Sequence, residues 1–203
     1  MNATLDATQM VLASSSPLRR QVVAAAGFDI RAVDPGIEEP ARHALPRGPV
    51  QKAEANAYFK ARAVAERYGT DGCVLGVSTV VAVGDQIFGP PAGRLEAEQM
   101  LRALSGTRHA VVTGVALLEN GLRLIASEVT YVTMRQMAED EIAEYLDSGN
   151  WIGTPGAYAG PEMACRFVDE VEGSYSNLLG LPVELVFRMI AEMQDHPEAH
   201  RHN

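Results

Sequence analysis

A hairpin signal in the second half of the chain constrains the fold most strongly. Asn120-Gly121 separates two long segments rich in β-branched and apolar residues, at 109–118 and 122–134. Asn-Gly is the dipeptide that most favours a tight two-residue turn, because both turn residues take positive φ angles. The pattern therefore predicts two long antiparallel strands that are neighbours in one sheet.

Strands and helices alternate in the first half of the chain. Residues 9–13 and 28–33 have the pattern of short strands, and the helical pattern between them ends at Gly27. Together with the later hairpin, this order predicts an α/β fold with a mixed sheet. The other expected elements are strands at 73–82 and 86–88, helices at 50–68, 95–104, 139–146 and from 182, a short element at 167–171, and loops at 149–160 and 173–180.

The spacing of apolar residues predicts which helical faces are buried. The expected inward residues are Val50, Ala53, Ala57, Ala61, Val64 and Ala65 in the helix at 50–68, Leu95, Met100, Leu101 and Leu104 in the helix at 95–104, and Val183, Val186, Phe187 and Ile190 in the last helix. Lys60 borders the first of these stripes. It either snorkels to solvent, which is the more common fate, or reaches into a cleft beside the helix.

The junction between the first strand and the first helix reads LASSSPLRR at residues 12–20. Ser16 suits an N-cap, because its hydroxyl can accept a hydrogen bond from an early helical amide, and Pro17 suits the first helical position. Arg19 and Arg20 are unusual in a first turn, because cations there face the positive end of the helix dipole at a cost of about 0.3–1 kcal/mol each. Two interpretations stay open. A phosphate bound at this end would make both arginines favourable, or they are solvated side chains at an ordinary strand-to-helix junction.

The composition excludes several classes of partner. With 203 residues, of which 47% are hydrophobic and 21% charged, the chain can build a substantial core. Its net charge of −9 argues against nonspecific binding to a nucleic acid polymer or an anionic membrane, but it allows a nucleotide in a local positive pocket. Residues 1–8 carry no signal-peptide pattern and the apolar stretch at 74–83 is too short to span a bilayer, so we expect a cytoplasmic protein.

Candidate metal ligands are few and scattered. Cys73 and Cys165 are isolated, which favours reduced thiols. Glu38 and Glu39 precede a proline-rich loop. Two adjacent carboxylates on a loop are usually solvated, and metal binding is the less common alternative. The segment 195–203 carries three histidines, and we expect a flexible polar tail there, because nothing holds the imidazoles in a ligand geometry.

Four segments in the same order along the chain carry a family resemblance. They are LASSSPLRR at 12–20, GVSTVVAVGDQIFGPP at 76–91, LSGTRHAVVTGVAL at 104–117, and PGAYAG with EGSYSNLLGLP at 155–160 and 172–182. In these segments the chain resembles the Maf family, nucleoside triphosphate pyrophosphatases that are also linked to septum formation. The resemblance implies a single Maf-like domain of two lobes over residues 9–194, with the tail at 195–203.

The resemblance also implies a fold, a reaction and a site. Family members look like two-lobed α/β proteins of the Maf/ITPase-like kind, with a mixed sheet and a nucleotide cleft between the lobes. They cleave a nucleoside triphosphate to a monophosphate and pyrophosphate, with Mg²⁺ or Mn²⁺ assisting the attacking water. By position, the resemblance implies that Ser14, Arg19, Lys60 and Thr79 bind the substrate and that Glu39 is a metal ligand. A homodimer stays an open alternative.

Several positions depart from the family pattern, and four of them bear most directly on catalysis. Ser78 stands where the family has its general-base aspartate, so the catalytic position carries a hydroxyl that cannot accept a proton at neutral pH without a base of its own. Leu18 replaces an arginine, and Pro90 and Thr154 replace lysines. Because loss of a positioned base typically costs about 10²–10⁴-fold in rate, these changes predict a catalytically impaired member that retains at most nucleotide or phosphate binding.

Two other functions remain open on the sequence alone. The first is an active pyrophosphatase that acts on a non-canonical or modified nucleotide through Glu39 and a displaced water. The second is a non-catalytic partner or regulatory protein, linked to cell division through the family. Turnover of nucleotides separates the first from the second.

Overall fold

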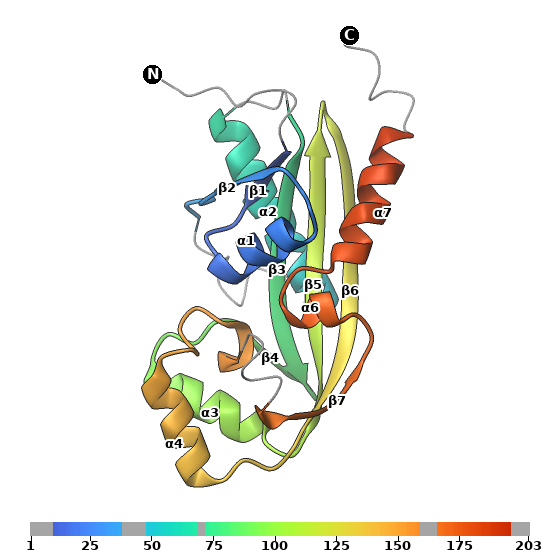
Figure 1. Cartoon of the computed structure of the whole chain (residues 1–203). Coiled ribbons are helices and arrows are strands. Elements are labelled where there is room, and N and C mark those ends of the chain that lie inside the picture. The colour runs from blue at the N-terminus through green and yellow to red at the C-terminus, as the bar shows by residue number, and fades with distance from the viewer. Residues whose placement is uncertain (1–9, 38–47, 69–71, 159–165, 196–203) are drawn as a thin grey trace.

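The computed structural model describes residues 10–37, 48–68, 72–158 and 166–195 (Figure 1). Seven strands in this part of the chain form one mixed sheet in the order β2-β1-β3-β5-β6-β7, and β4 pairs with β3. The strands are β1 (Met10–Ala13), β2 (Ile30–Val33), β3 (Val74–Val83), β4 (Gln86–Phe88), β5 (Arg108–Glu119), β6 (Leu122–Met134) and β7 (Val168–Glu172). The helices are α1 (Pro17–Ala25), α2 (Pro49–Tyr68), α3 (Arg94–Leu104), α4 (Glu139–Ser148), α6 (Tyr175–Leu178), α7 (Val183–Gln194) and the 3-10 turn η1 (Pro155–Ala157). The predicted α/β fold with a mixed sheet is confirmed.

The predicted hairpin joins β5 to β6. Asn120 and Gly121 have φ angles of 48° and 81°, which are the positive values that a two-residue turn of this kind requires. The two strands pair antiparallel from Glu119↔Leu122 to Arg108↔Thr133. At the other edge of the sheet, β1 pairs parallel with both β2 and β3, and so the parallel and antiparallel parts of the sheet meet at β3.

Helices cover both faces of the sheet (Figure 1). On one face, Ala57, Ala61 and Val64 of α2 pack with Val11, Val74 and Ala116 of the sheet. On the other face, Val23 of α1 and Leu185, Val186 and Met189 of α7 pack with Leu12, Leu75, Val77 and Val115. The predicted apolar stripe of α2 is therefore buried except for Val50, which is half-buried, and β3 and β5 lie at the centre of the sandwich.

Two glycines let α2 approach the sheet closely. A Cβ atom on Gly76 of β3 would overlap the backbone carbonyl of Ala57, and a Cβ on Gly114 of β5 would overlap the backbone of Ala53 and Glu54. Both overlaps involve main-chain atoms, which no change of rotamer can move away. Helix α2 therefore packs against the bare backbone of the two central strands at these positions.

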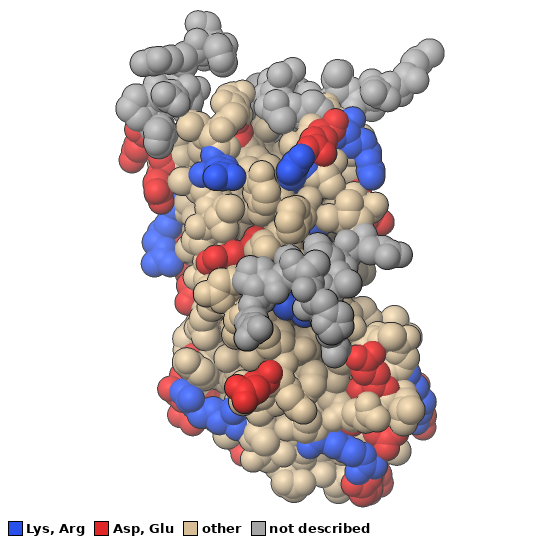
Figure 2. Space-filling model, turned by 180° about the vertical axis from the view of Figure 1, so that it is seen from behind, with Lys and Arg blue, Asp and Glu red and all other residues tan. Residues whose placement is uncertain are grey.

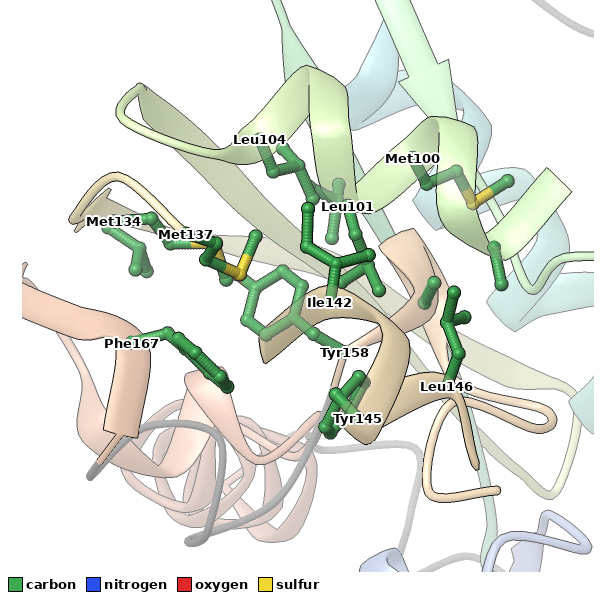
Figure 3. Packing of buried hydrophobic residues seen from close by; sticks show 14 of the residues in the cluster. Met100, Leu101, Leu104, Met134, Met137, Ile142, Tyr145, Leu146, Tyr158 and Phe167 are labelled. Atoms are coloured by element: carbon green, nitrogen blue, oxygen red, sulfur yellow. The ribbon is translucent and has the colours of Figure 1, made fainter. Parts of the chain in front are cut away.

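The molecule has two lobes, as predicted (Figure 1). Strands β1 and β2 with α1, α2 and α7 lie in one lobe, α3, α4 and η1 lie in the other, and β3, β5 and β6 extend through both. Figure 3 shows the core of the second lobe, where side chains of α3 and α4 meet Tyr158 and Phe167. Its labelled members are Met100, Leu101, Leu104, Met134, Met137, Ile142, Tyr145, Leu146, Tyr158 and Phe167. Each lobe thus has a hydrophobic core beside the shared sheet.

Two side chains that the helical patterns place inward are exposed. Leu95 is 71% exposed and Phe187 is 49% exposed. At 100° per residue, Leu95 lies about 180° from Leu104, which is buried in α3, and therefore points to solvent. Phe187 borders the buried stripe of α7 and instead stacks on Phe28, with ring centroids 4.4 Å apart.

The segment 173–180, predicted as a loop, contains the short helix α6. The Ser174 hydroxyl caps this helix, because it accepts a hydrogen bond from the Asn177 amide at 3.2 Å.

Charged side chains of both signs are interspersed on the face shown in Figure 2. Among the described residues, several surface arginines form ion pairs, such as Arg135 with Glu141 at 2.7 Å and Arg166 with Glu144 at 2.6 Å. On the part of this face that the structure describes, the basic side chains do not form a continuous track of the kind that binds a phosphate backbone. None of the described helices has the length and apolar character needed to cross a bilayer.

Candidate functional site

A cleft of about 1030 Å³ lies between the lobes. One wall comes from residues 14–19 at the start of α1 and from 178–180 after α6, and the opposite wall comes from residues 152–155 after α4. The sequence predicts Ser14, Arg19, Lys60 and Thr79 as substrate-binding residues, and all four line this cleft. The structure therefore brings these positions together from α1, α2, β3 and the segment before α1, although their binding roles remain predictions.

The start of α1 has the predicted capping geometry. Pro17 is the first residue of the helix, and the Ser16 hydroxyl accepts a hydrogen bond from the Arg19 amide at 3.4 Å. The Ser14 hydroxyl in turn accepts from the Ser16 amide at 3.2 Å. These contacts fix the serine turn that carries the chain from β1 into the cleft wall.

The Arg19 guanidinium connects three parts of the cleft. Its Nε donates to the Gly180 carbonyl at 2.8 Å, and its Nη2 donates to Thr79 Oγ1 at 2.8 Å. Its Nη1 donates to the Val77 carbonyl at 3.2 Å and to Ser14 Oγ at 3.5 Å. The interpretation of Arg19 as a solvated side chain is therefore wrong, because its donors hold the Gly180 turn against β3. Arg20 is exposed and donates to the Ser15 carbonyl at 3.4 Å.

The predicted catalytic position, Ser78, is not among the described residues that line the cleft. Thr79 and Val81 line the cleft, and successive residues of a strand point to opposite faces. Gly76 and Val80 pack toward α2, and Ser78 lies between them on that face. Ser78 is fully buried. The hydroxyl that faces the cleft from this part of β3 is that of Thr79, which contacts Thr113 Oγ1 at 2.9 Å.

Uncharged side chains occupy the three positions at which the family resemblance implies a cation. Leu18, Pro90 and Thr154 all line the cleft. The Thr154 hydroxyl donates to the Trp151 carbonyl at 2.8 Å, which holds it in its own turn. Beside Thr154, Ile152 is 68% exposed at the cleft. With uncharged residues at these positions, the described cleft walls carry less positive charge than they would with cations there.

A buried polar pair lies beside the cleft, where Tyr158 is a lining residue, and the sequence did not predict that its two members would meet. His109 Nε2 and the Tyr158 hydroxyl are 2.7 Å apart, and both residues are almost fully buried. Burial raises the pKa of the Tyr158 phenol, and it lowers the pKa of His109 from 6.5 to about 4. The pair holds the segment after η1 against β5. The partners are 49 positions apart in the sequence; both lie in segments that carry the family resemblance, but no local pattern indicates that their side chains meet.

The His109 imidazole makes the stability of the fold depend on pH. Because its folded-state pKa is about 4 and its ordinary value is 6.5, the unfolded chain binds more protons between these values, and stability falls as the pH drops through this window. The loss amounts to at most about 1.4 kcal/mol per pH unit for one proton. We expect His109→Gln to remove this slope, measured as the difference in urea unfolding between wild type and variant from about pH 7 to about pH 5, above the usual carboxylate range. Parallel curves for the two proteins would contradict the assignment.

Metal binding by the predicted ligand is not tested by the structure. Glu39 lies outside the described residues, as do Cys165 and residues 196–203 of the predicted tail at 195–203. Within the described ranges, no group of three or more His, Cys, Asp and Glu side chains is arranged to hold a metal ion. Asp34 is the acidic residue that the described part of the cleft presents.

Comparison with known proteins places the chain in a family. The family model described as Maf-like protein matches residues 9–193. A dTTP/UTP pyrophosphatase of Ruminiclostridium cellulolyticum is 36% identical over 188 residues, which cover 92% of this chain and 96% of the relative. A dTTP/UTP pyrophosphatase of Hahella chejuensis is 39% identical over 86% of this chain and 87% of its own, and one of Thermococcus kodakarensis is 34% identical over 89% and 94%. The match covers both lobes and every segment that carries the resemblance, and the chain therefore belongs to the Maf family.

Proposed function

We propose that the protein binds a pyrimidine nucleotide in the cleft between its lobes and releases pyrophosphate from nucleoside triphosphates much more slowly than its relatives. The observation that carries this proposal is the set of cleft side chains Leu18, Pro90 and Thr154. The family resemblance implies cations at these three positions, and cations are what neutralise the transferred phosphates. A cleft of about 1030 Å³ with hydroxyl, guanidinium and ammonium groups has the size and polarity for a nucleotide.

The residue at the position where the family resemblance implies a general base supports the same proposal. Ser78 replaces the aspartate that the resemblance implies, and its hydroxyl is fully buried beside α2. A serine hydroxyl has no affinity for a proton at neutral pH, so it cannot activate a water. Loss of a positioned base typically lowers a rate by about 10²–10⁴-fold.

The names of the relatives suggest which nucleotides to test, and the family resemblance suggests the metal. The relatives at 34–39% identity are named dTTP/UTP pyrophosphatases, which makes dTTP and UTP the first nucleotides to test. We further propose that Ser14, Arg19, Lys60 and Thr79 contact the nucleotide, since all four line the cleft. Mg²⁺ or Mn²⁺ is the metal to include, with Glu39 as the proposed ligand.

The decisive experiment measures pyrophosphate release from dTTP, UTP, the other common nucleotides and modified nucleotides, with Mg²⁺ and with Mn²⁺. The Ruminiclostridium cellulolyticum relative serves as the active control at equal protein concentration. We expect turnover on every nucleotide to stay at least about 100-fold below that of the relative. Turnover within tenfold of the relative on any nucleotide would reject catalytic impairment and favour an active enzyme with a displaced base.

A second arm of this experiment tests binding. A nucleotide that binds the folded state raises the melting temperature by mass action, and we expect dTTP or UTP to do so. Arg19→Ala is expected to abolish this shift, because Arg19 lines the cleft and holds the Gly180 turn. Arg20→Ala is the matched control, since Arg20 is exposed and is not among the described lining residues. If neither nucleotide shifts the wild-type melting temperature, the proposal of nucleotide binding fails.

A further inference from the structure

The described walls of the cleft carry little positive charge. Among the lining residues that the structure describes, Arg19 and Lys60 are cationic and Asp34 is anionic. Each phosphate added to a nucleotide brings further negative charge, which needs a cation or a hydrogen-bond donor when it leaves water. The charge of the ligand is therefore a property that this cleft can discriminate.

Most N–H donors of Arg19 already have acceptors. Nε and Nη2 form one of the guanidinium edges that can bind a phosphate with two parallel hydrogen bonds, and here they donate to the Gly180 carbonyl and to Thr79 Oγ1, both at 2.8 Å. A phosphate at this edge would displace the Gly180 turn from β3 and leave a partly buried carbonyl without its donor. Arg19 therefore builds the cleft wall, at the expense of its capacity to clamp a phosphate chain.

Side chains on both sides of the cleft are poor partners for a phosphate chain. Leu18 at the start of α1 faces the cleft from one lobe, and Ile152 and Pro90 face it from the other. Thr154 has a hydroxyl, but this hydroxyl donates to the Trp151 carbonyl. Bringing an anion against such surfaces costs desolvation free energy, and Leu18, Ile152 and Pro90 have no side-chain donor to compensate for it. The second and third phosphates of a nucleotide would meet this cost wherever they lie against these side chains.

From these observations we infer that the cleft binds a nucleoside monophosphate at least as tightly as the corresponding triphosphate, so that its ligand resembles the product of the family reaction. This inference rests on the proposed nucleotide binding. The class of ligand that follows for this cleft is a nucleotide of low charge, whose base and sugar make most of the contacts with the protein. It also accounts for a family fold that keeps the cleft while the positions around it have become uncharged.

The test is a calorimetric titration of the full-length protein with UMP, UDP and UTP, with EDTA present so that no metal neutralises the phosphates. We expect the Kd for UTP to equal or exceed that for UMP. A Kd for UTP at least tenfold below that for UMP would overturn the inference, because the cleft would then supply the missing positive charge. The wild-type protein alone decides this comparison, and no variant has to fold for it.

A pair of variants checks the cause. Pro90→Lys combined with Thr154→Lys restores two cations at the cleft, and we expect it to lower the Kd for UTP at least tenfold relative to UMP. Gln86→Lys adds the same kind of charge at an exposed residue of β4 outside the described lining and is expected to leave the ratio of the two Kd values unchanged. An equal change in both variants would show that the net charge of the protein sets the preference, and this would overturn the inference.

Failure of the inference is distinguishable from failure of the proposed function. If all three nucleotides bind with a metal and none binds with EDTA, nucleotide binding stands and the inference is wrong. If none of UMP, UDP and UTP binds with EDTA, Mg²⁺ or Mn²⁺, the proposed function fails and takes the inference with it. If UTP binds tenfold more tightly than UMP, the proposed function stands and only the inference is lost.

Discussion

Ser78→Asp combined with Pro90→Lys and Thr154→Lys is expected to release pyrophosphate from UTP or dTTP at least about 100-fold faster than the wild type, whereas Ser78→Asp alone stays near the wild-type rate. Groups that act as one catalytic unit are strongly non-additive. A carboxylate without the two additional lysines leaves part of the phosphate charge uncompensated, because Arg19 and Lys60 are the cations among the described lining residues. Ser78 is also fully buried, and burial disfavours the charged form of an isolated carboxylate.

The measurement is pyrophosphate release by the single and triple variants at equal concentrations of folded protein. Pro90→Lys with Thr154→Lys, without the change at Ser78, is the control that separates phosphate binding from base catalysis. If Ser78→Asp alone reached the rate of an active relative, the uncharged residues at the cleft would be without consequence. The protein would then be one substitution away from an efficient enzyme, and our account of the cleft would be wrong.

Gly114→Ala is expected to lower the free energy of unfolding by more than about 3 kcal/mol, or to prevent folding. A Cβ on Gly114 overlaps the backbone of Ala53 and Glu54, so α2 would have to move away from the sheet along with the apolar side chains that it buries. Gly89→Ala is the matched control, because no atom lies within 4 Å of a Cβ at that position. Thermal and urea unfolding of the two variants provide the measurement. A loss below about 1 kcal/mol in Gly114→Ala would mean that α2 packs less closely than described.

The elements that local chemistry specifies could be predicted from the sequence. Asn120-Gly121 gave a hairpin with the expected φ angles, and Ser16 with Pro17 gave a helix start with the expected cap. Turns and caps depend on a few neighbouring residues, so their signals survive without knowledge of the fold. The mixed sheet followed from the order of strands and helices. The family resemblance then predicted which of these elements would face one another across a cleft.

Contacts between distant segments could not be predicted in this way. The Arg19 side chain meets the Gly180 carbonyl across 161 positions of the sequence, and no local pattern around either residue signals the other. The predictions that Leu95 of α3 and Phe187 of α7 point inward are wrong, because an apolar residue within a helix does not always lie on its buried face. The helix α6 escaped prediction because four residues are too short to show a helical period.

The sequence predicted which positions belong to the site, but it did not predict which way their side chains point. Four predicted residues do line one cleft. The alternation of β3 separates Ser78 from Thr79, and a period-2 count could have shown that adjacent residues of one strand face opposite sides. The polar pair of His109 and Tyr158 carries no such signal, since it forms only when the segment after η1 returns to β5.

The three strands that pass through both lobes also limit how the cleft can open. Rotation of one domain against another needs a hinge, a short stretch in which a few residues absorb large changes in φ and ψ. Between these lobes, β3 and β5 remain paired from Val74↔Leu118 to Ala82↔Ala110 without a register shift, so rigid rotation would break a continuous ladder of hydrogen bonds. The width of the cleft is then set by the stiffness of the sheet, and adaptation to a ligand falls to side chains and to the turns at its mouth. Such a protein selects ligands by fit to a preformed space, and a small ligand gains little from closure around it.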